Sequence, residues 1–207
     1  MRRSPVWIAV ALLVGGSLSL PASSSANPRK TLREWARGPA HWLMLPEEKR
    51  ALRAVRTDEE AAQFLIDFWQ RRDPDPSDSI NPAQEQFWER LEAADRLYGQ
   101  GRKRGSMTPR GGALILFGAA SVLRLSQHTA PSWSPRSPAR SPTFDVTQVT
   151  VEEWEYPADE LHPRLATLIR HEGYERAVLK FLIEADRTTF MEGERLLELA
   201  AQAAVER

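Results

Sequence analysis

Two amphipathic helical segments separated by a proline-rich break constrain the fold of this chain more than any other feature. The first is "RTDEEAAQFLIDFWQRR", where Thr57 and Glu60 match a capping box and apolar residues recur at helical spacing. The stretch "DPDPSDSI" then ends the helix, because proline disfavours helical dihedrals in the residue before it. Asn81 and Pro82 match the cap and first position of a second helix. We expect both helices to pack against each other or against a common sheet.

The remaining elements predict an α+β fold in which amino-terminal amphipathic helices pack on a small β-sheet, with a carboxy-terminal helix. Pro46, followed by two glutamates, indicates another helix start. Strands are expected in the glycine-bounded apolar run 113–117, in "TVEEWEY" and in the alternating run 177–185. Residues 126–143, rich in proline and serine, are expected to form a mobile loop. The tail 186–207 is expected to be the final helix, with an alanine-rich face that packs closely or docks weakly.

The first 26 residues have the pattern of a signal peptide. Arg2 and Arg3 precede an apolar run of about fifteen residues, which is shorter than the roughly 20 needed to span a bilayer. Small residues follow, and cleavage is expected after Ala26; an uncleaved amino-terminal anchor is the alternative. A polar lead-in, 27–41, then precedes a domain over 42–185. We expect a periplasmic or secreted protein, with no stable membrane span after cleavage.

Composition excludes several classes of function. The chain has no cysteine, which rules out disulfides, thiolate metal sites and a cysteine nucleophile. Its 28 basic and 28 acidic residues balance, so there is no bulk attraction to nucleic acid. The four histidines are scattered without metal-ligand spacing, and no nucleophile elbow or phosphate loop is present. We therefore predict no metal, no cofactor and no catalytic residues.

A longer pattern runs from "LPEEKRALRAVRTDEEAAQFLIDFWQRRDPDP" through "RLYGQGRKRGSMTPRGGALILFGAAS" to "VEEWEYP". Over residues 42–156 the chain resembles the GWxTD domain, a family of exported bacterial proteins with no assigned activity. The residues that match the family's motifs are Trp69, Pro74, Gly105, Thr108, Gly111 and Gly118. The motif that names the family is only partly present, because Ser106 stands where tryptophan is expected and Pro109 where aspartate is expected. A ligand site built on those two residues would be lost here, whereas a structural motif could change in this way if the packing compensates.

Five residues are candidates for binding: Arg71, Arg72, Asp73, Arg110 and Trp133. The three at 71–73 follow a predicted helix, where arginines can complement the helix dipole and aspartate can cap a turn. The alternative is an anion site built on the bidentate geometry of arginine. Trp133 lies in the proline- and serine-rich loop, where an exposed indole could contact a carbohydrate, a membrane surface or a partner; the alternative is that it folds back on the domain.

Two functions from different classes follow. The first is a noncatalytic protein-binding or structural module of the cell envelope, whose partner is another envelope protein. The second is an enzyme that acts on a cell-wall or small anionic substrate through an Arg/Asp site. If the side chains of Arg71, Arg72, Asp73 and Arg110 converge on one pocket, the enzyme is favoured, and if they are dispersed, the binding module is favoured.

Overall fold

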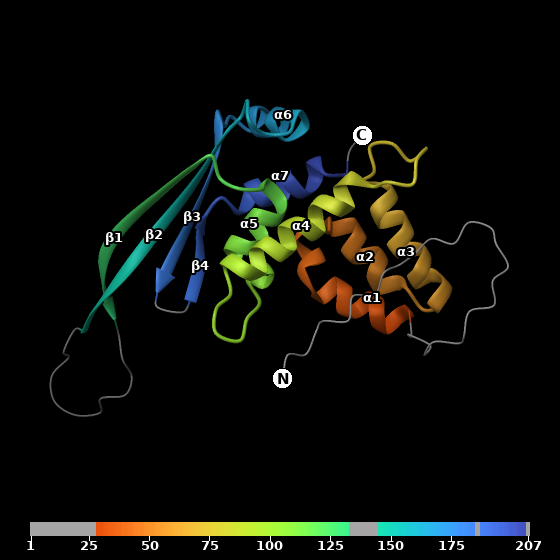
Figure 1. The fold of residues 1–207 in the computed structure, drawn as a ribbon, viewed down its shortest axis with the longest axis horizontal. Coiled ribbons are helices and arrows are strands. Elements are labelled where there is room, and N and C mark those ends of the chain that lie inside the picture. Colours follow the sequence, from red (N-terminus) through yellow and green to blue (C-terminus); the bar gives the residue numbers. More distant parts are fainter. Residues whose placement is uncertain (1–27, 133–144, 185–186, 206–207) are drawn as a thin grey trace.

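The computed structural model describes residues 28–132, 145–184 and 187–205. These residues form an α+β fold with seven α-helices, two short 3₁₀ helices and a four-stranded antiparallel sheet, which confirms the predicted fold class (Figure 1). The predicted signal peptide, 1–26, and Trp133 lie outside the described residues. The elements, in chain order, are α1 (Pro28–Arg37), η1 (Pro39–Trp42), α2 (Pro46–Ala54), α3 (Asp58–Gln70), α4 (Pro82–Leu97), η2 (Gly105–Met107), α5 (Pro109–Phe117), β1 (Val122–Ser132), β2 (Asp145–Pro157), α6 (Pro163–His171), β3 (Arg176–Glu184), β4 (Arg187–Glu192) and α7 (Glu194–Ala203).

Helices α2, α3 and α4 begin at the capping residues and prolines that the sequence predicts. The Thr57 hydroxyl accepts the backbone N–H of Glu60, and the Glu60 carboxylate accepts the N–H of Thr57, so the capping box of α3 is confirmed. The Asn81 side chain accepts the N–H of Gln84 and begins α4, with Pro82 at the first helical position. Pro46 likewise begins α2.

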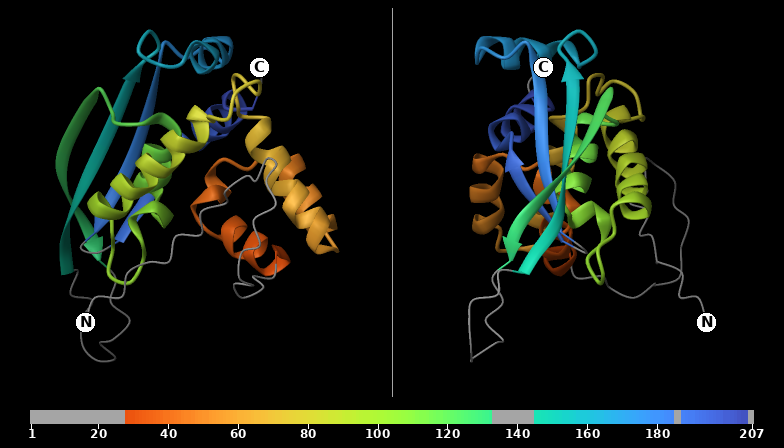
Figure 2. Two further views of the ribbon diagram at one scale, coloured as in Figure 1. Left: turned by 45° about the vertical axis from the view of Figure 1, so that its right-hand side comes forward. Right: turned by 90° about the vertical axis from the view of Figure 1, so that its left-hand side faces the viewer.

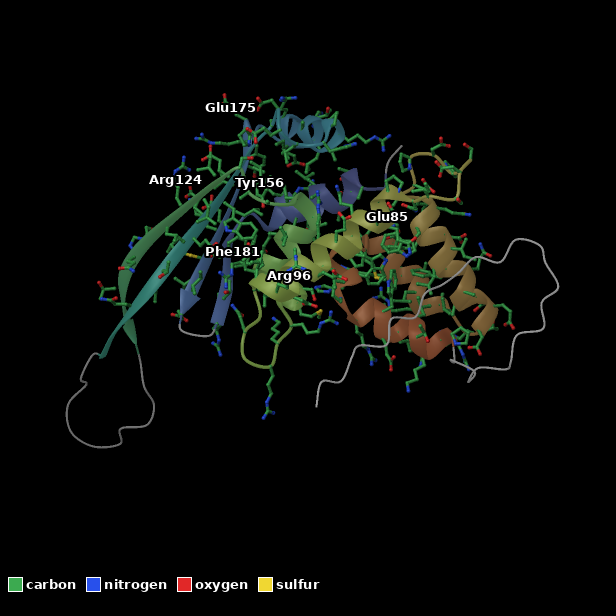
Figure 3. The ribbon with its side chains drawn as sticks, in the orientation of Figure 1. Glu85, Arg96, Arg124, Tyr156, Glu175 and Phe181 are labelled. Carbon is green, nitrogen blue, oxygen red and sulfur yellow. The ribbon has the colours of Figure 1, made fainter. Side chains whose placement is uncertain are left out.

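The sheet has the order β1-β2-β3-β4, and all neighbouring strands are antiparallel. All described helices lie on one side of it (Figure 2). The residues Trp154, Tyr156 and Phe181 face the helices and are almost fully buried. Figure 3 shows Tyr156 and Phe181 on this side, whereas Arg124 lies on the other. The sheet therefore has one face in the core and one face in solvent, as antiparallel sheets commonly do.

The solvent face of the sheet carries a ladder of ion pairs across the strands. Arg124 on β1 pairs with Glu153 and Glu155 on β2, and Lys180 on β3 pairs with Glu153 at 3.7 Å. Arg176 pairs with Glu155 at 3.0 Å. Opposite charges on neighbouring strands stabilise this face without an apolar cover.

The core consists of two apolar clusters that share Leu116 at their border. One lies between the sheet and helices α5, α6 and α7. The other joins α1, α3, α4 and α5, and its aromatic rings meet edge to face, with Trp35 and Phe68 centroids 4.7 Å apart. A tilted contact of 5.4 Å between Trp69 and Phe87 links α3 to α4, as expected for two helices that pack together.

The strand expected at 113–117 is wrong: these residues are the second half of α5. Thr108 caps this helix by accepting the N–H of Gly111, and Pro109 takes the first helical position. Helix α5 contributes residues to both apolar clusters, so it needs no polar face. Its apolar residues are therefore consecutive and do not recur every three to four positions as they do in an amphipathic helix. Periodicity alone does not separate such a helix from a buried strand.

Three predicted boundaries also differ from the structure. Residues 126–132 belong to β1 and pair with β2, so they are not part of a loop, while 133–143 lie outside the described residues. The expected final helix begins only at Glu194, because β4 comes first and pairs with β3. The lead-in contains α1, whose Leu32 is buried. The other two strands, predicted in 150–156 and 177–185, are confirmed within β2 and β3.

Across the described ranges, none of the helices combines the length and the apolar character needed to cross a bilayer.

Candidate binding groove

A groove of about 720 Å³ opens where the ends of five helices meet. In Figure 1 the loop after α3, helix α6 and the carboxyl end of α7 all lie along the upper edge of the molecule. The groove is lined from these elements, and also from the first turns of α4 and the last residues of α5. Its charged and histidine side chains are Arg71, Arg72, Asp73, Arg90, Glu160, His162 and Arg164.

Arg72 is fixed in the wall of this groove by a buried ion pair. Its guanidinium nitrogens donate to both carboxylate oxygens of Glu48, at 2.9 and 2.8 Å, and to the carbonyls of Phe68 and Leu43. The guanidinium also stacks 3.6 Å from the Phe68 ring centre. Burial lowers the pKa of Arg72, and the hydrogen bonds and charge of Glu48 act against that shift. This arginine joins α2 to α3 and has a structural role.

Arg71 and Asp73 are the neighbours of Arg72 in the sequence, and of these two only Arg71 contacts Glu48. Arg71 lies 2.9 Å from Glu48, but its side chain remains 45% exposed. The Asp73 carboxylate accepts the backbone N–H of Asp75 at 3.1 Å, which shapes the turn after α3. The structure therefore brings these three candidates together, mainly as the corner between α3 and α4.

Arg110 lies apart from the groove. It donates to Glu152 at 2.9 Å, and the other oxygen of that carboxylate accepts the Trp154 indole N–H at 2.7 Å. The Arg110 guanidinium also lies 4.9 Å from the centre of the Tyr98 ring. This network joins α5 to the sheet, so the four candidate side chains do not converge on one pocket.

Two arginines of the groove were not predicted as site residues. Arg90 on α4 donates to the carbonyls of Ile115 and Leu116, at 3.0 and 3.3 Å, and so binds the free carboxyl end of α5. Burial lowers its pKa, while the surrounding Tyr156 and Glu89 act in the opposite direction. Neither Arg90 nor Arg164 forms an ion pair with any described residue. The sequence held a signal for Arg90, which stands at helical spacing among the apolar residues Phe87, Leu91 and Ala94.

The motif glycines allow the backbone to approach closely. A Cβ on Gly105 would lie 1.9 Å from the Ala94 carbonyl oxygen, and a Cβ on Gly111 would lie 1.9 Å from the Gly105 carbonyl oxygen. The buried Thr108 hydroxyl donates to the Gly105 carbonyl and accepts the Gly111 N–H. These residues pack η2 between α4 and α5, away from the residues that line the groove.

The other motif matches also serve the scaffold. Gly118 ends α5 at φ +85°, a conformation that favours glycine, and its carbonyl accepts the Tyr156 hydroxyl at 3.1 Å. Trp69 is partly buried in the helical cluster, and its carbonyl accepts the Asn81 side chain at 2.9 Å. Of the six motif matches, only Pro74 lines the groove.

Within residues 28–132, 145–184 and 187–205, no group of three or more histidine, aspartate or glutamate side chains could hold a metal ion. Comparison with known proteins adds no relative: no family model, no curated protein and no solved structure matches the chain.

Proposed function

We propose that this protein is an exported, GWxTD-like domain that acts as a noncatalytic protein-binding or structural module of the cell envelope. The resemblance over residues 42–156 and the signal-like first 26 residues support this proposal. The expected location is the periplasm or the exterior of the cell, and the expected partner is another envelope protein.

One observation about the groove carries the binding function. Both carboxylates that line it already accept local hydrogen bonds, Asp73 from the backbone of Asp75 and Glu160 from the hydroxyl of Ser121. Arg90 and Arg164, in contrast, form no ion pair with any described residue. Guanidiniums that form no ion pair and lie beside apolar side chains suit recognition of an acidic partner.

A second function, an enzyme acting on a cell-wall or small anionic substrate, has one observation in its favour. Arg71, Arg72 and Asp73 do line the same groove, and its volume falls in the range of about 300–1,000 Å³ that small-molecule sites occupy. Arg110, the fourth residue of that proposal, belongs to a separate network with Glu152. The dispersal favours the binding module.

Purification of the tagged full-length chain from envelope fractions of its native cells tests the proposal. We expect the chain in the envelope or the medium, in a stoichiometric complex with one other protein. A chain that stays in the cytosol contradicts the export part of the proposal. A monomer that carries a small metabolite in native mass spectrometry, with no protein partner, contradicts the binding part and supports the enzyme.

A further inference from the structure

We propose that the groove binds an acidic segment of a partner polypeptide, with a carboxylate on Arg90 and Arg164 and a neighbouring apolar side chain on the groove floor. This inference rests on the proposed protein-binding function and names the chemistry of the partner. Charge, the geometry of Arg90 and the apolar floor each support it.

The charge of the groove favours an anion. Four arginines and two acidic residues line it, so cations outnumber carboxylates by two. Glu48, which lies behind the lining, pairs with Arg71 and Arg72 and offsets one of their two charges. With Glu48 included, these seven charges sum to +1, and among the described residues Arg90 and Arg164, on α4 and α6, are the two lining arginines that form no ion pair.

Arg90 is already positioned to receive a carboxylate. Its Nη1 is held by the carbonyls of Ile115 and Leu116, which fixes the plane of the guanidinium. Its Nε and Nη2 form no hydrogen bond with a described residue, and both lie beside Gly118, where a Cβ would be 3.6 Å from Nε and 3.1 Å from Nη2. These two nitrogens form one edge of the fork that binds a carboxylate through two parallel hydrogen bonds. Because the side chain is already ordered, less rotamer entropy is lost on binding.

The floor of the groove favours a polypeptide over a small inorganic anion. It consists of apolar side chains from α5, from α6 and the loop before it, and from the end of α7, namely Leu116, Phe117, Leu161, Leu165, Ala200, Ala203 and Ala204. Phe117, Leu165, Ala200 and Ala203 are themselves buried, so the accessible apolar surface of the floor comes mainly from the half-buried Leu116, Leu161 and Ala204. A phosphate ion would leave this floor uncovered, whereas a peptide with an acidic and an apolar residue close together would contact both parts.

Selection from a random heptapeptide library displayed on phage, panned on the full-length protein, tests this inference. We expect enriched peptides to contain aspartate or glutamate within two positions of leucine, isoleucine or phenylalanine. Substitution of Arg164→Gln should weaken binding of the enriched synthetic peptides at least tenfold, because the side chain has no ion pair in the described structure whose loss would disturb the fold. Ala204→Glu, which places a carboxylate in the groove, should weaken binding by a similar factor.

Arg170→Gln is the matched control, because Arg170 is exposed on the same helix as Arg164 but does not line the groove. It should leave peptide affinity unchanged, and added salt should weaken wild-type binding. Enriched peptides that lack acidic residues, or acidic peptides that bind Arg164→Gln and Ala204→Glu as tightly as wild type, would overturn the inference while leaving the protein-binding function in place. If no peptide is enriched, the inference fails, and a stoichiometric envelope partner then decides the proposed function separately.

Discussion

Arg71 and Arg72 at the end of α3 take different roles although they are neighbours in the sequence. Both reach the carboxylate of Glu48, but the Arg72 side chain is only 1% exposed and the Arg71 side chain is 45% exposed. Arg72 is therefore part of the core that joins α2 to α3, and Arg71 remains at the rim of the groove. The sequence predicts that both arginines lie at the end of a helix. Their different roles depend on where Glu48 of α2 lies in the folded chain, because Arg72 is buried against it and Arg71 is not.

Substitution of Glu48→Gln should lower the free energy of unfolding by about 3–5 kcal/mol, because it leaves the buried Arg72 guanidinium without its counter-ion. Urea unfolding followed by tryptophan fluorescence measures the change. Glu47→Gln, at the exposed neighbouring position, should change stability by less than about 0.5 kcal/mol. Equal stability of Glu48→Gln and wild type would show that the buried pair does not hold α2 on α3.

Protonation of Glu155 at acidic pH should lower the stability of the folded protein, because it weakens the ion pairs of this carboxylate with Arg124 and Arg176. The hydrogen bond and charge of Arg124, together with Arg176, hold the pKa of Glu155 below its ordinary value. A depressed folded-state pKa contributes stability that is present above the ordinary value of 4.5 and is lost as the pH falls through the folded-state pKa. The stability difference between wild type and Glu155→Gln should therefore be larger at neutral pH than below pH 4.5, measured by urea unfolding. The control Glu175→Gln, exposed and without an ion pair in the described part of the chain, should show no such dependence.

At the scale of elements, the sequence predicts best those helices and strands that carry their own local signals. Thr57 and Glu60, and later Asn81 and Pro82, determine two helix starts without tertiary help. Alternating residues likewise predict β3. The apolar run of α5 has no such period, because the surrounding clusters bury it on all sides. The overlooked signal there is Thr108 followed by Pro109, a cap and first position.

The candidate site was predictable only in part, for a similar reason. The corner at 71–73 is predictable, because its residues are consecutive and precede Pro74. Arg90 and Arg164 join that corner only in the folded chain, since they come from α4 and α6. Whether these two arginines form an ion pair depends on the positions of the acidic side chains in the folded chain. A local sequence pattern does not give those positions. Arg110 lies apart from this corner, because its partner Glu152 is on β2, and the sequence contains no local signal for that pairing.

The glycine contacts between α4, η2 and α5 predict a clear stability effect. Gly111→Ala should destabilise the fold by about 1–3 kcal/mol or more, because the new Cβ would overlap the Gly105 carbonyl at 1.9 Å and the helix would have to shift. Thermal unfolding of the variant measures this. Gly99→Ala serves as the control, since its Cβ would lie an ordinary 3.7 Å from the nearest atom. A Gly111→Ala variant as stable as Gly99→Ala would contradict the close-packing role of this motif glycine.

At the scale of the whole molecule, the two sides of the sheet differ in what they offer a partner. The outer side carries charges that neutralise one another across the strands, as Arg124, Glu153 and Lys180 do. The groove on the helical side combines unpaired guanidiniums with apolar side chains. This contrast places the expected contact surface at the meeting point of α3, α4, α6 and α7 (Figures 1 and 2).

Site-specific photocrosslinking in native cells tests that placement most directly. A photoreactive amino acid would replace Ala204 in the groove in one variant and the exposed Ser126 on the outer side of the sheet in another. The account predicts a discrete protein adduct from position 204 and none from position 126. An adduct from position 126 alone, or no adduct from 204 under conditions where the partner copurifies, would contradict the groove as the binding surface.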